Sequence, residues 1–424
     1  MTTMARLLQD EVIPTFHRVQ CFENQEKLDD MTLSVKQQLS RPGTLERVPA
    51  GARVAIAVGS RRIDQLPRIL KTLIRELKNK GAIPFIIPAM GNHGGATAEG
   101  QANLLRSMGV SDKSMNVPIL SGLETVMVGR THGGMAVHVD RYAVEADMII
   151  PVNRIKPNGT EQANLESGLV KMLAVGLGNQ SNATRLHQMA QQDFSQNMLQ
   201  MARVILEQCM VPFGLGVIEN ANHQIWQIAA IPAEHIEAEE PQLLQQARLL
   251  MPCLPYPKID ILMIDVMGSD ISSTGIDPTI AGRSITRQLS KPFPDRIGVL
   301  NLSRRSAGDA YGIGLADCVT HRLFSAMDRN LTFQHAVMTN QVECVRIPPI
   351  MESDEQCLRF LMKTCPGSGA TGFRIIWLKN TWDLSEFHVS EGLMLDSLNR
   401  PEISVDQKTL KPAFDDKGRF LSFI

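Results

Sequence analysis

The sequence predicts an α/β protein built from two α/β domains with mostly parallel sheets. Short, continuously apolar segments alternate with segments of helical spacing, first over residues 53–58, 63–80 and 83–90. Such alternation is typical of parallel strands joined by helices that cover both faces of a sheet. The chain has 424 residues. Because one domain usually spans about 100 to 200 residues, we expect two domains.

The N-terminal half carries the clearest element signals. The apolar run at residues 53–58 ends at Gly59, and the helical spacing of 63–80 stops at Gly81. After the strand at 83–90, Thr97 is placed to cap the next helix. Also expected in this half are a hairpin at 125–129 and 135–139, strands at 146–152, 213–218 and 224–228, and a helix at 233–250.

A proline-rich stretch marks the predicted domain boundary. Residues 251–258 (MPCLPYPK) hold three prolines, which interrupt any helix or central strand. We therefore predict domains over residues 1–252 and 253–424. In the second domain we expect strands at 259–266, 297–302, 342–347 and 373–378, with helices around 310–327 and 355–364. Ligands of such sheets bind beyond the carboxyl ends of the strands.

Composition narrows the classes of partner and location. The chain is 43% hydrophobic and 21% charged with a net charge of -1, and no run of like charge points to nucleic acid or to an acidic membrane. No signal-peptide or membrane-spanning pattern is found. The seven cysteines are scattered and never spaced as CxxC, so neither a disulfide framework nor a zinc or iron–sulfur site is expected. A reducing cytoplasm is the expected location.

The first chemical motif is GNHGGAT, which directly follows the strand at 83–90. His93 can transfer protons near neutral pH, while Gly94 and Gly95 permit positive φ and a close approach of the backbone to a ligand. The alternative is a glycine-rich connection with an incidental histidine.

The second motif is the segment 153–187, NRIKPNGTEQANLESGLVKMLAVGLGNQSNATRLH. Glu166 and Ser167 are expected at the start of a short helix with Lys171 in its first turns. A lysine beside a helix N-terminus and apolar neighbours tends towards a depressed pKa and covalent chemistry, although a solvated surface lysine is the simpler interpretation. His187 is expected on the next helix, as a ligand or as a satisfied core histidine.

The order of these motifs resembles the nickel-dependent lactate racemase family, and more closely its broad branch of uncharacterised homologues. The shared strings are GNHGGAT, KPNGT, ESGLVKM and GLGNQSNATRLH, followed by GSDISSTGIDPTIAGR and GDAYGIGLADCVTHR, so the resemblance covers about residues 54–347. Members of this family bind a pyridinium-derived nickel-pincer nucleotide, which is tethered through a thioacyl link to a lysine. The resemblance implies an active site in the cleft between the two domains.

The resemblance assigns roles to individual residues. Lys171 occupies the position of the tethering lysine, although SGLVK stands here for the family's SGG-x-K, and His187 matches the histidine that completes nickel coordination. His93 matches a base beside the substrate. Gly94, Gly95, Ser167 and Gly168 are the other expected cofactor-binding positions, and Arg61, Arg62, Ser269 and Asp270 the expected substrate-binding ones. Arg61 and Arg62 suit a substrate carboxylate, with surface solvation as the alternative.

Three positions depart from the pattern of the family. Asn158 stands where the family's KPHT has a second histidine, and asparagine cannot act as a proton base. Ser269 replaces a lysine and Asp309 an asparagine, so a strongly anionic substrate should bind worse if both face the cleft. The loop 268–275 around Ser269 suits an anion or is simply a turn-rich connection.

Together these features predict a racemase or epimerase of a small 2-hydroxy acid that works by hydride and proton transfer. The expected cofactor is the nickel-pincer nucleotide on Lys171, with Asn158 in place of one catalytic base. The expected partners are the 2-hydroxy acid and the enzymes of cofactor synthesis. The alternative is a non-catalytic or one-sided, oxidoreductase-like relative that binds a nucleotide-like anionic ligand in the same cleft.

Overall fold

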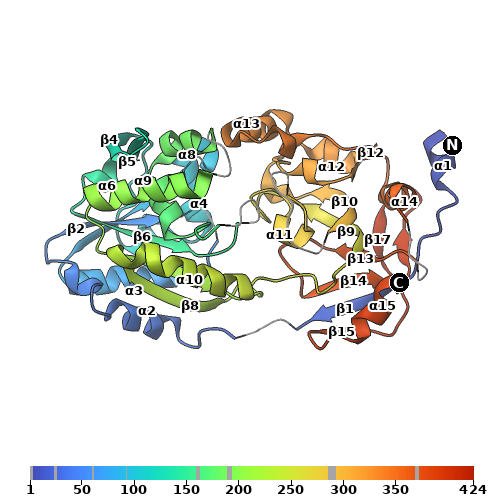
Figure 1. The fold of residues 1–424 in the computed structure, drawn as a ribbon, viewed down its shortest axis with the longest axis horizontal. Coiled ribbons are helices and arrows are strands. Elements are labelled where there is room, and N and C mark those ends of the chain that lie inside the picture. Colours follow the sequence, from blue (N-terminus) through green and yellow to red (C-terminus); the bar gives the residue numbers. More distant parts are fainter. Residues whose placement is uncertain are drawn as a thin grey trace. The chain divides into compact units, whose positions relative to one another are not determined.

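The protein is divided into two compact units. The computed structural model describes residues 3–22, 26–59, 62–91, 93–158, 163–188, 193–284, 293–367 and 372–424. The middle unit consists of residues 24–251, and the end unit combines residues 1–23 with residues 252–424. Both units are α/β (Figure 1), which confirms the predicted fold class.

One five-stranded sheet forms the middle unit, in the order β3-β2-β6-β7-β8. Its strands are β2 (Arg53–Val58), β3 (Ile83–Pro88), β6 (Met148–Arg154), β7 (Phe213–Glu219) and β8 (Ile225–Pro232). The first four strands of this order are parallel, and β8 returns antiparallel to β7. The predicted parallel sheet is therefore confirmed here.

Helices cover both faces of this sheet, which is why its central strands read as continuous apolar runs. One face packs on α2 (Met31–Leu39), α3 (Leu66–Asn79), α4 (Ala98–Ser107) and α5 (Asp112–Met115). The other face packs on α6 (Arg141–Val144), α9 (Phe194–Gln208) and α10 (Ile236–Leu249). The predicted hairpin is confirmed as β4 (Thr125–Arg130) and β5 (Ala136–Asp140).

The segment that carries Lys171 is not one regular helix. A single turn, α7 (Leu169–Lys171), continues into a π-helical turn (Met172–Gly176), and α8 (Asn179–His187) follows. Such π-helical turns occur frequently at functional sites. The predicted helix start at Glu166 and Ser167 is wrong, because both residues lie before α7 and are bound to other parts of the unit.

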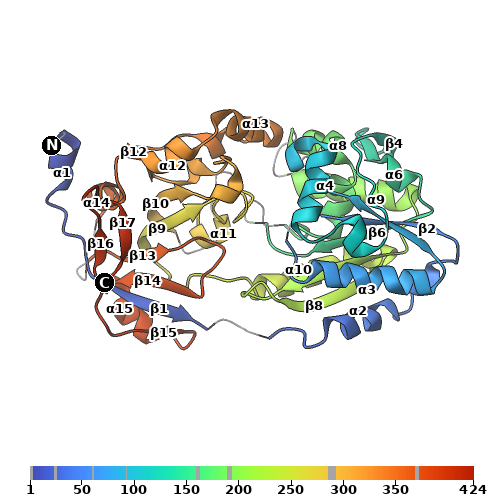
Figure 2. The same ribbon diagram turned by 180° about the vertical axis from the view of Figure 1, so that it is seen from behind.

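The sheet of the end unit has eight strands in the order β12-β11-β10-β9-β13-β14-β1-β15, seen from both sides in Figures 1 and 2. They are β1 (Phe16–Cys21), β9 (Ile259–Met267), β10 (Pro294–Leu302), β11 (Cys318–Thr320), β12 (Ile350–Met351), β13 (Ile375–Leu378), β14 (Glu386–Ser390) and β15 (Ile403–Val405). The strands from β12 to β13 in this order are parallel, and β14, β1 and β15 are antiparallel to their neighbours.

Two apolar clusters, one on each face, anchor the other elements of the end unit. On one face Trp377 packs with Phe16 and Phe420, whose ring centroids lie 6.0 and 4.5 Å away. The elements on that face are α1 (Thr3–Leu8), α14 (Asp354–Thr364) and the hairpin of β16 (Pro412–Phe414) and β17 (Phe420–Phe423), and those on the other are α11 (Pro278–Ala281), α12 (His321–Ala326) and α15 (Glu391–Leu398). The helix α13 (Arg329–Thr339) packs beside Tyr311 through Ala336.

The first strand corrects the predicted domain assignment. Residues 1–23 were expected in an N-terminal domain of residues 1–252, but β1 pairs with β14 and β15 of the end unit. The chain crosses back between Met251 and Pro252. Periodicity identifies a strand but not its partner, so the sequence did not reveal this pairing.

Two element predictions in the second half are also wrong. Residues 342–347, predicted as a strand, form a short 3-10 turn (Val342–Val345). The helix predicted around 310–327 is broken into a 3-10 turn (Ile313–Leu315), β11 and α12. Gly312 has φ +97, and a Cβ on Gly314 would lie 2.0 Å from the Glu343 carbonyl oxygen, so this stretch turns tightly where a regular helix cannot.

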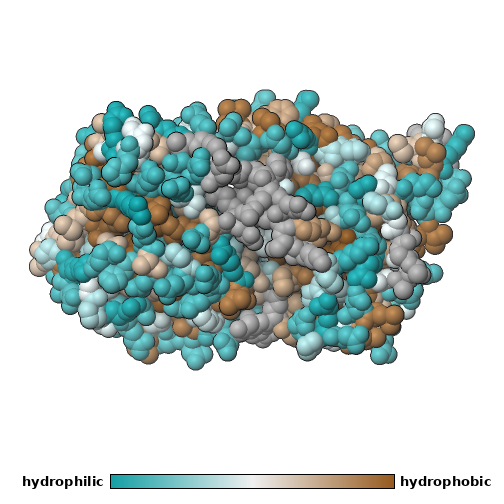
Figure 3. All heavy atoms as spheres, viewed as in Figure 1, coloured by the Kyte–Doolittle hydropathy of each residue, from teal (hydrophilic) through white to brown (hydrophobic). Residues whose placement is uncertain are grey.

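Polar residues cover most of the visible surface of each unit (Figure 3). Among the described helices, none is both long enough and apolar enough to span a bilayer.

Candidate active site

The middle unit has one point where its sheet topology favours a ligand. The chain leaves β2 towards β3 on one side and leaves β6 towards β7 on the other. In open α/β sheets, ligands bind outside the carboxyl ends of the strands at such a switch point. Gly59 follows β2 there, and residues 155–158 follow β6.

The segment that carries Lys171 packs directly against these strand ends. A Cβ on Gly59 would lie 3.0 Å from Asn153 Oδ1 and 3.2 Å from Met172 Cε. At the end of β3, the Gly91 amide donates to the Gly176 carbonyl oxygen at 3.3 Å, and a Cβ on Gly176 would lie 2.7 Å from the Ala89 carbonyl oxygen. The glycines therefore allow the π-helical turn to lie on the edge of the sheet.

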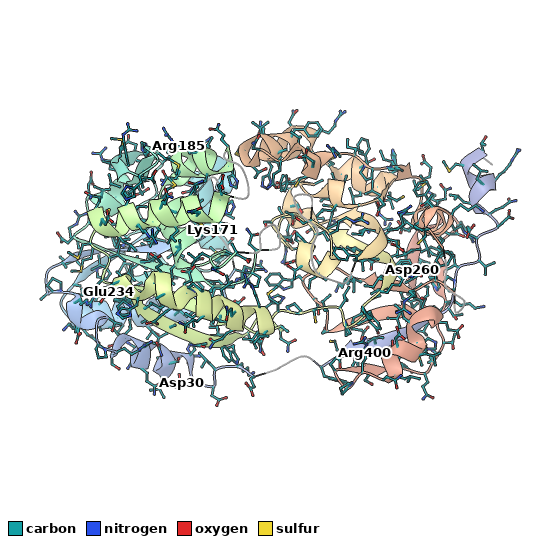
Figure 4. All side chains as sticks on the ribbon, in the orientation of Figure 1. Asp30, Lys171, Arg185, Glu234, Asp260 and Arg400 are labelled. Carbon is teal, nitrogen blue, oxygen red and sulfur yellow. The ribbon has the colours of Figure 1, made fainter. Side chains whose placement is uncertain are left out.

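Lys171 and His187 both lie near one aromatic ring, that of Phe194. The Lys171 Nζ atom lies 5.8 Å from the centroid of the Phe194 ring. The His187 ring lies 5.5 Å from the same ring at an interplanar angle of 38°. Both side chains are half-buried, and Lys171 lies beside α9, the helix that begins with Phe194 (Figure 4). The two residues predicted to hold the cofactor thus lie near the same ring.

A buried glutamate from α10 closes the start of α7. Glu240 Oε2 accepts hydrogen bonds from the amides of Leu169 at 2.8 Å and Val170 at 3.0 Å. Burial raises the pKa of Glu240 to about 7, against the opposing effect of these two amides. The Asn153 side-chain amide donates to the Gly168 carbonyl oxygen at 2.7 Å. Gly168, an expected cofactor-binding position, is buried between these two contacts.

The start of α8 is held by the hairpin. Asp140 accepts a hydrogen bond from the Asn179 side chain at 2.9 Å, and burial raises the pKa of Asp140 to about 6. Asn182 donates to the carbonyl oxygens of His138 and Ala174, both at 2.8 Å. A Cβ on Gly178 would lie 2.1 Å from the Asn182 side-chain nitrogen. These contacts fix the helix that bears His187 against the turn that bears Lys171.

The GNHGGAT loop lies after β3, as predicted. His93 is half-buried, and its amide donates to the Met90 carbonyl oxygen at 3.1 Å. Gly94 and Gly95 have φ of +68 and +67, so the predicted positive φ is confirmed at both positions. A Cβ on Gly94 would lie 2.6 Å from the backbone nitrogen of Gln101. Gly94 therefore allows the loop to pack on its own helix, while Gly95 has open space around it.

Asn158 follows β6 on a backbone that a second buried glutamate fixes. The Asn158 amide and the Ala163 amide both donate to Glu166. Arg248 pairs with the same carboxylate at 2.5 Å. The backbone of Ser167 is paired with that of Lys156, with amide-to-carbonyl distances of 3.3 and 2.9 Å. The carboxylate of Glu166 and the backbone of Ser167 thus stabilise the loop before α7.

The predicted substrate-binding residues are more scattered. Arg61 lies outside the described residues, and Arg62 is exposed after β2. Ser269 and Asp270 belong to the end unit, in the loop after β9. Asp270 accepts hydrogen bonds from the hydroxyls of Ser303 at 3.1 Å and Ser306 at 3.4 Å, both from the loop after β10.

Within the described part of the chain, no three or more His, Cys, Asp or Glu side chains gather as metal ligands.

The fold and the site together define a two-unit α/β protein with a lysine and a histidine at the switch point of a parallel sheet. Residues 7–198 match the family model described as the lactate racemase N-terminal domain. This match confirms the predicted resemblance to the lactate racemase family over this part of the chain. No curated protein matches the chain in sequence.

Two solved structures resemble the chain at low sequence identity. The lactate racemase apoprotein from Thermoanaerobacterium thermosaccharolyticum matches with a TM-score of 0.47 and 13% identity, over 80% of this chain and 88% of that chain. A protein from Thermotoga maritima matches with a TM-score of 0.46 and 14% identity, over 65% of this chain and 71% of that chain.

Sequence reasoning missed Phe194 and Glu240. For Glu240 a signal existed, because it falls on the apolar stripe of its helix with Ile236, Leu243 and Leu244. A carboxylate in a buried stripe needs hydrogen-bond donors, and these are the amides of α7. Phe194 had no such signal, because an aromatic residue at a helix start is usually part of the core.

Proposed function

We propose that the protein is a racemase or epimerase of a small 2-hydroxy acid, with a nickel-pincer nucleotide tethered to Lys171. The observation that carries this proposal is the placement of Lys171 and His187 on the Phe194 ring. A covalent tether and a single neutral imidazole suit a metal whose other ligands come from the cofactor. The match of residues 7–198 to the lactate racemase N-terminal domain supports a related activity.

In this proposal, four residues of the chain have separate roles. Lys171 holds the cofactor by its side-chain nitrogen, and His187 supplies an imidazole nitrogen to the nickel. When bound, the cofactor supplies a hydride acceptor and donor for the α-carbon of the substrate. His93, at the end of β3, takes the hydroxyl proton from the substrate and returns it. Arg62, exposed after β2, is available to bind the substrate carboxylate.

Asn158 supports a second candidate function. Racemisation requires a proton acceptor for the substrate hydroxyl in either configuration. The side-chain amide of Asn158 cannot accept that proton. A one-sided enzyme, which oxidises one enantiomer by passing its hydride to the cofactor and from there to an external two-electron acceptor, needs His93 alone. A non-catalytic relative that binds a nucleotide-like anion needs neither residue as a base.

Production of the chain together with the enzymes of cofactor synthesis tests these candidates. We expect a mass increase on the peptide that contains Lys171 and retained nickel, with neither in Lys171→Arg. The matched control is Lys80→Arg, which removes an exposed lysine at the end of α3 and should load as the wild type does.

Chiral assays over a panel of 2-hydroxy acids then separate the functions. Interconversion of enantiomers supports the racemase. Redox turnover without interconversion supports the one-sided enzyme, and neither adduct nor nickel on the wild-type chain overturns the cofactor proposal.

A further inference from the structure

Glu240 holds the turn that ends at Lys171, although it lies outside every recognised motif. The Glu240 side chain is completely buried, and its Oε2 atom accepts both the Leu169 and the Val170 amides. These are the first two amides of α7. Because a helix leaves its first amides without internal partners, a carboxylate at this place satisfies them.

The neighbouring backbone is shaped to admit this carboxylate. A Cβ on Gly168 would lie 2.2 Å from Glu240 Oε1 and 2.6 Å from Glu240 Cδ, which no side chain tolerates. Gly168 also has no side chain with which to cap the turn itself. On the opposite side its carbonyl oxygen accepts from Asn153, at the end of β6. The start of α7 is therefore fixed between a strand of the sheet and α10.

The turn needs this support, because α7 has only three residues before the π-helical turn begins. An isolated turn of helix is unstable in water, since few hydrogen bonds offset the loss of backbone freedom. A carboxylate also interacts favourably with the positive end of the helical dipoles, which a neutral amide does only weakly. A buried acid without such partners would destabilise the fold.

We propose that Glu240 is the positioning residue of Lys171: it closes the start of α7 and fixes the lysine at the switch point of the sheet. This rests on the proposed function in one respect, the identification of Lys171 as the tether. One consequence is that the amides of Leu169 and Val170 are not available to a phosphate or carboxylate of a ligand. The cofactor must be bound by other groups.

The test uses the cofactor-free full chain, so that its result does not depend on nickel chemistry. Hydrogen exchange at the Leu169 and Val170 amides measures directly whether their hydrogen bonds to Glu240 are intact. Isotope-coded acetylation with acetic anhydride measures the reactivity of Lys171 relative to that of the exposed Lys80. We expect Glu240→Ala to speed both amides by about tenfold, the usual effect of a lost cap. Acetylation of Lys171 should rise about threefold or more, because its half-buried side chain is released.

Two further variants keep the test valid if Glu240→Ala does not fold. Glu240→Gln keeps the shape and one acceptor atom, so its effects should lie between wild type and Glu240→Ala. Gly168→Ala places a methyl group against the Glu240 carboxylate and should displace it. This variant should therefore show the same faster exchange at Leu169 and Val170 as Glu240→Ala. The matched control is Asp30→Asn, a carboxylate that caps α2 in the same unit by accepting the Leu33 amide at 3.0 Å. It should leave the exchange of Leu169 and Val170 unchanged.

The outcomes separate this proposal from the proposed function. Unchanged exchange and unchanged Lys171 acetylation in Glu240→Gln and Gly168→Ala would overturn the positioning role. So would equal changes in Asp30→Asn, which would indicate a general loosening of the unit. Loading is measured separately: a wild-type chain that never forms the adduct contradicts the proposed function, while the exchange data still decide the role of Glu240.

Discussion

Two half-buried histidines, one in each unit, lie against aromatic rings in different chemical surroundings. In the end unit, the His335 ring stacks on Tyr311 at 4.0 Å and 17°, and its Nδ1 atom lies 3.0 Å from Asp309. In the middle unit, the His187 ring is tilted against the Phe194 ring, and the Lys171 Nζ atom lies near the same ring. A carboxylate orients the first histidine, whereas an amine shares the aromatic ring of the second.

The polar groups around Asp309 in the end unit form hydrogen bonds with one another. Asp309 also accepts the Tyr311 amide at 3.0 Å, and the Tyr311 hydroxyl donates to Gln341 at 2.8 Å. Asp309 was expected to add negative charge against an anionic substrate, but its carboxylate is buried and bound inside this cluster.

The largest expected effect separates the two histidines. His187→Ala should lower nickel retention by at least about a hundredfold. Loss of a group that hydrogen-bonds to a metal ligand already lowers metal affinity by about tenfold to a hundredfold, and loss of the ligand itself should lower it more. His335→Ala should retain nickel as the wild type does. Nickel content after gel filtration measures both. Equal nickel loss in the two variants would remove the distinction between them.

The second prediction concerns the buried Glu240, which should make the stability of the fold depend on pH. Burial raises the pKa of Glu240 from 4.5 to about 7, so between these values the folded chain keeps a proton that the unfolded chain releases. The proton on Glu240 therefore favours the folded state at low pH, and the free energy of unfolding falls as the pH rises. Glu240→Gln should reduce this loss between pH 5 and pH 8 by about 2.5 kcal/mol. Urea unfolding of the middle unit at both pH values measures it, and identical pH dependence in the two proteins would contradict the raised pKa.

The third prediction concerns Asn158, which stands where the family pattern has a second histidine. Asn158→His should raise racemisation about tenfold, because a positioned imidazole accepts a proton that the amide cannot. His93→Asn should lower it by a similar or larger factor. Rates for both enantiomers are measured by chiral chromatography at matched nickel content. A rate unaffected by Asn158→His would mean that this residue is not at the position of the second base.

The smallest expected effect lies in the end unit. Asp309→Asn should reduce the free energy of unfolding by about 1 kcal/mol, since it weakens the charge-assisted contact with His335. Asp270→Asn, at an exposed carboxylate, should change stability by less than about 0.5 kcal/mol. Chemical unfolding measures both. Loss of the cofactor adduct in Asp309→Asn would show that the end unit affects the lysine site.

Much of the fold was predictable because it depends on local pattern. Strands at 53–58 and 83–90 and the Thr97 cap follow from periodicity and from side-chain chemistry at neighbouring positions. The 3-10 turn at Val342–Val345 was not predictable, because an apolar run fits a strand or a turn equally until its packing is known. The placement of β1 depends on partners more than three hundred residues away in the chain.

The sequence by itself determined the fold class, the parallel strands, the position of His93 after β3 and the order of the motifs that carry Lys171 and His187. These features follow from hydrophobic periodicity and from motif order, which are properties of neighbouring residues. Only the tertiary structure decided that Phe194 receives both Lys171 and His187, that Glu240 closes α7, and that Asp309 is bound to His335. Each of these contacts joins distant segments, and burial of the groups, which gives them their energetic weight, exists only once the chain has folded.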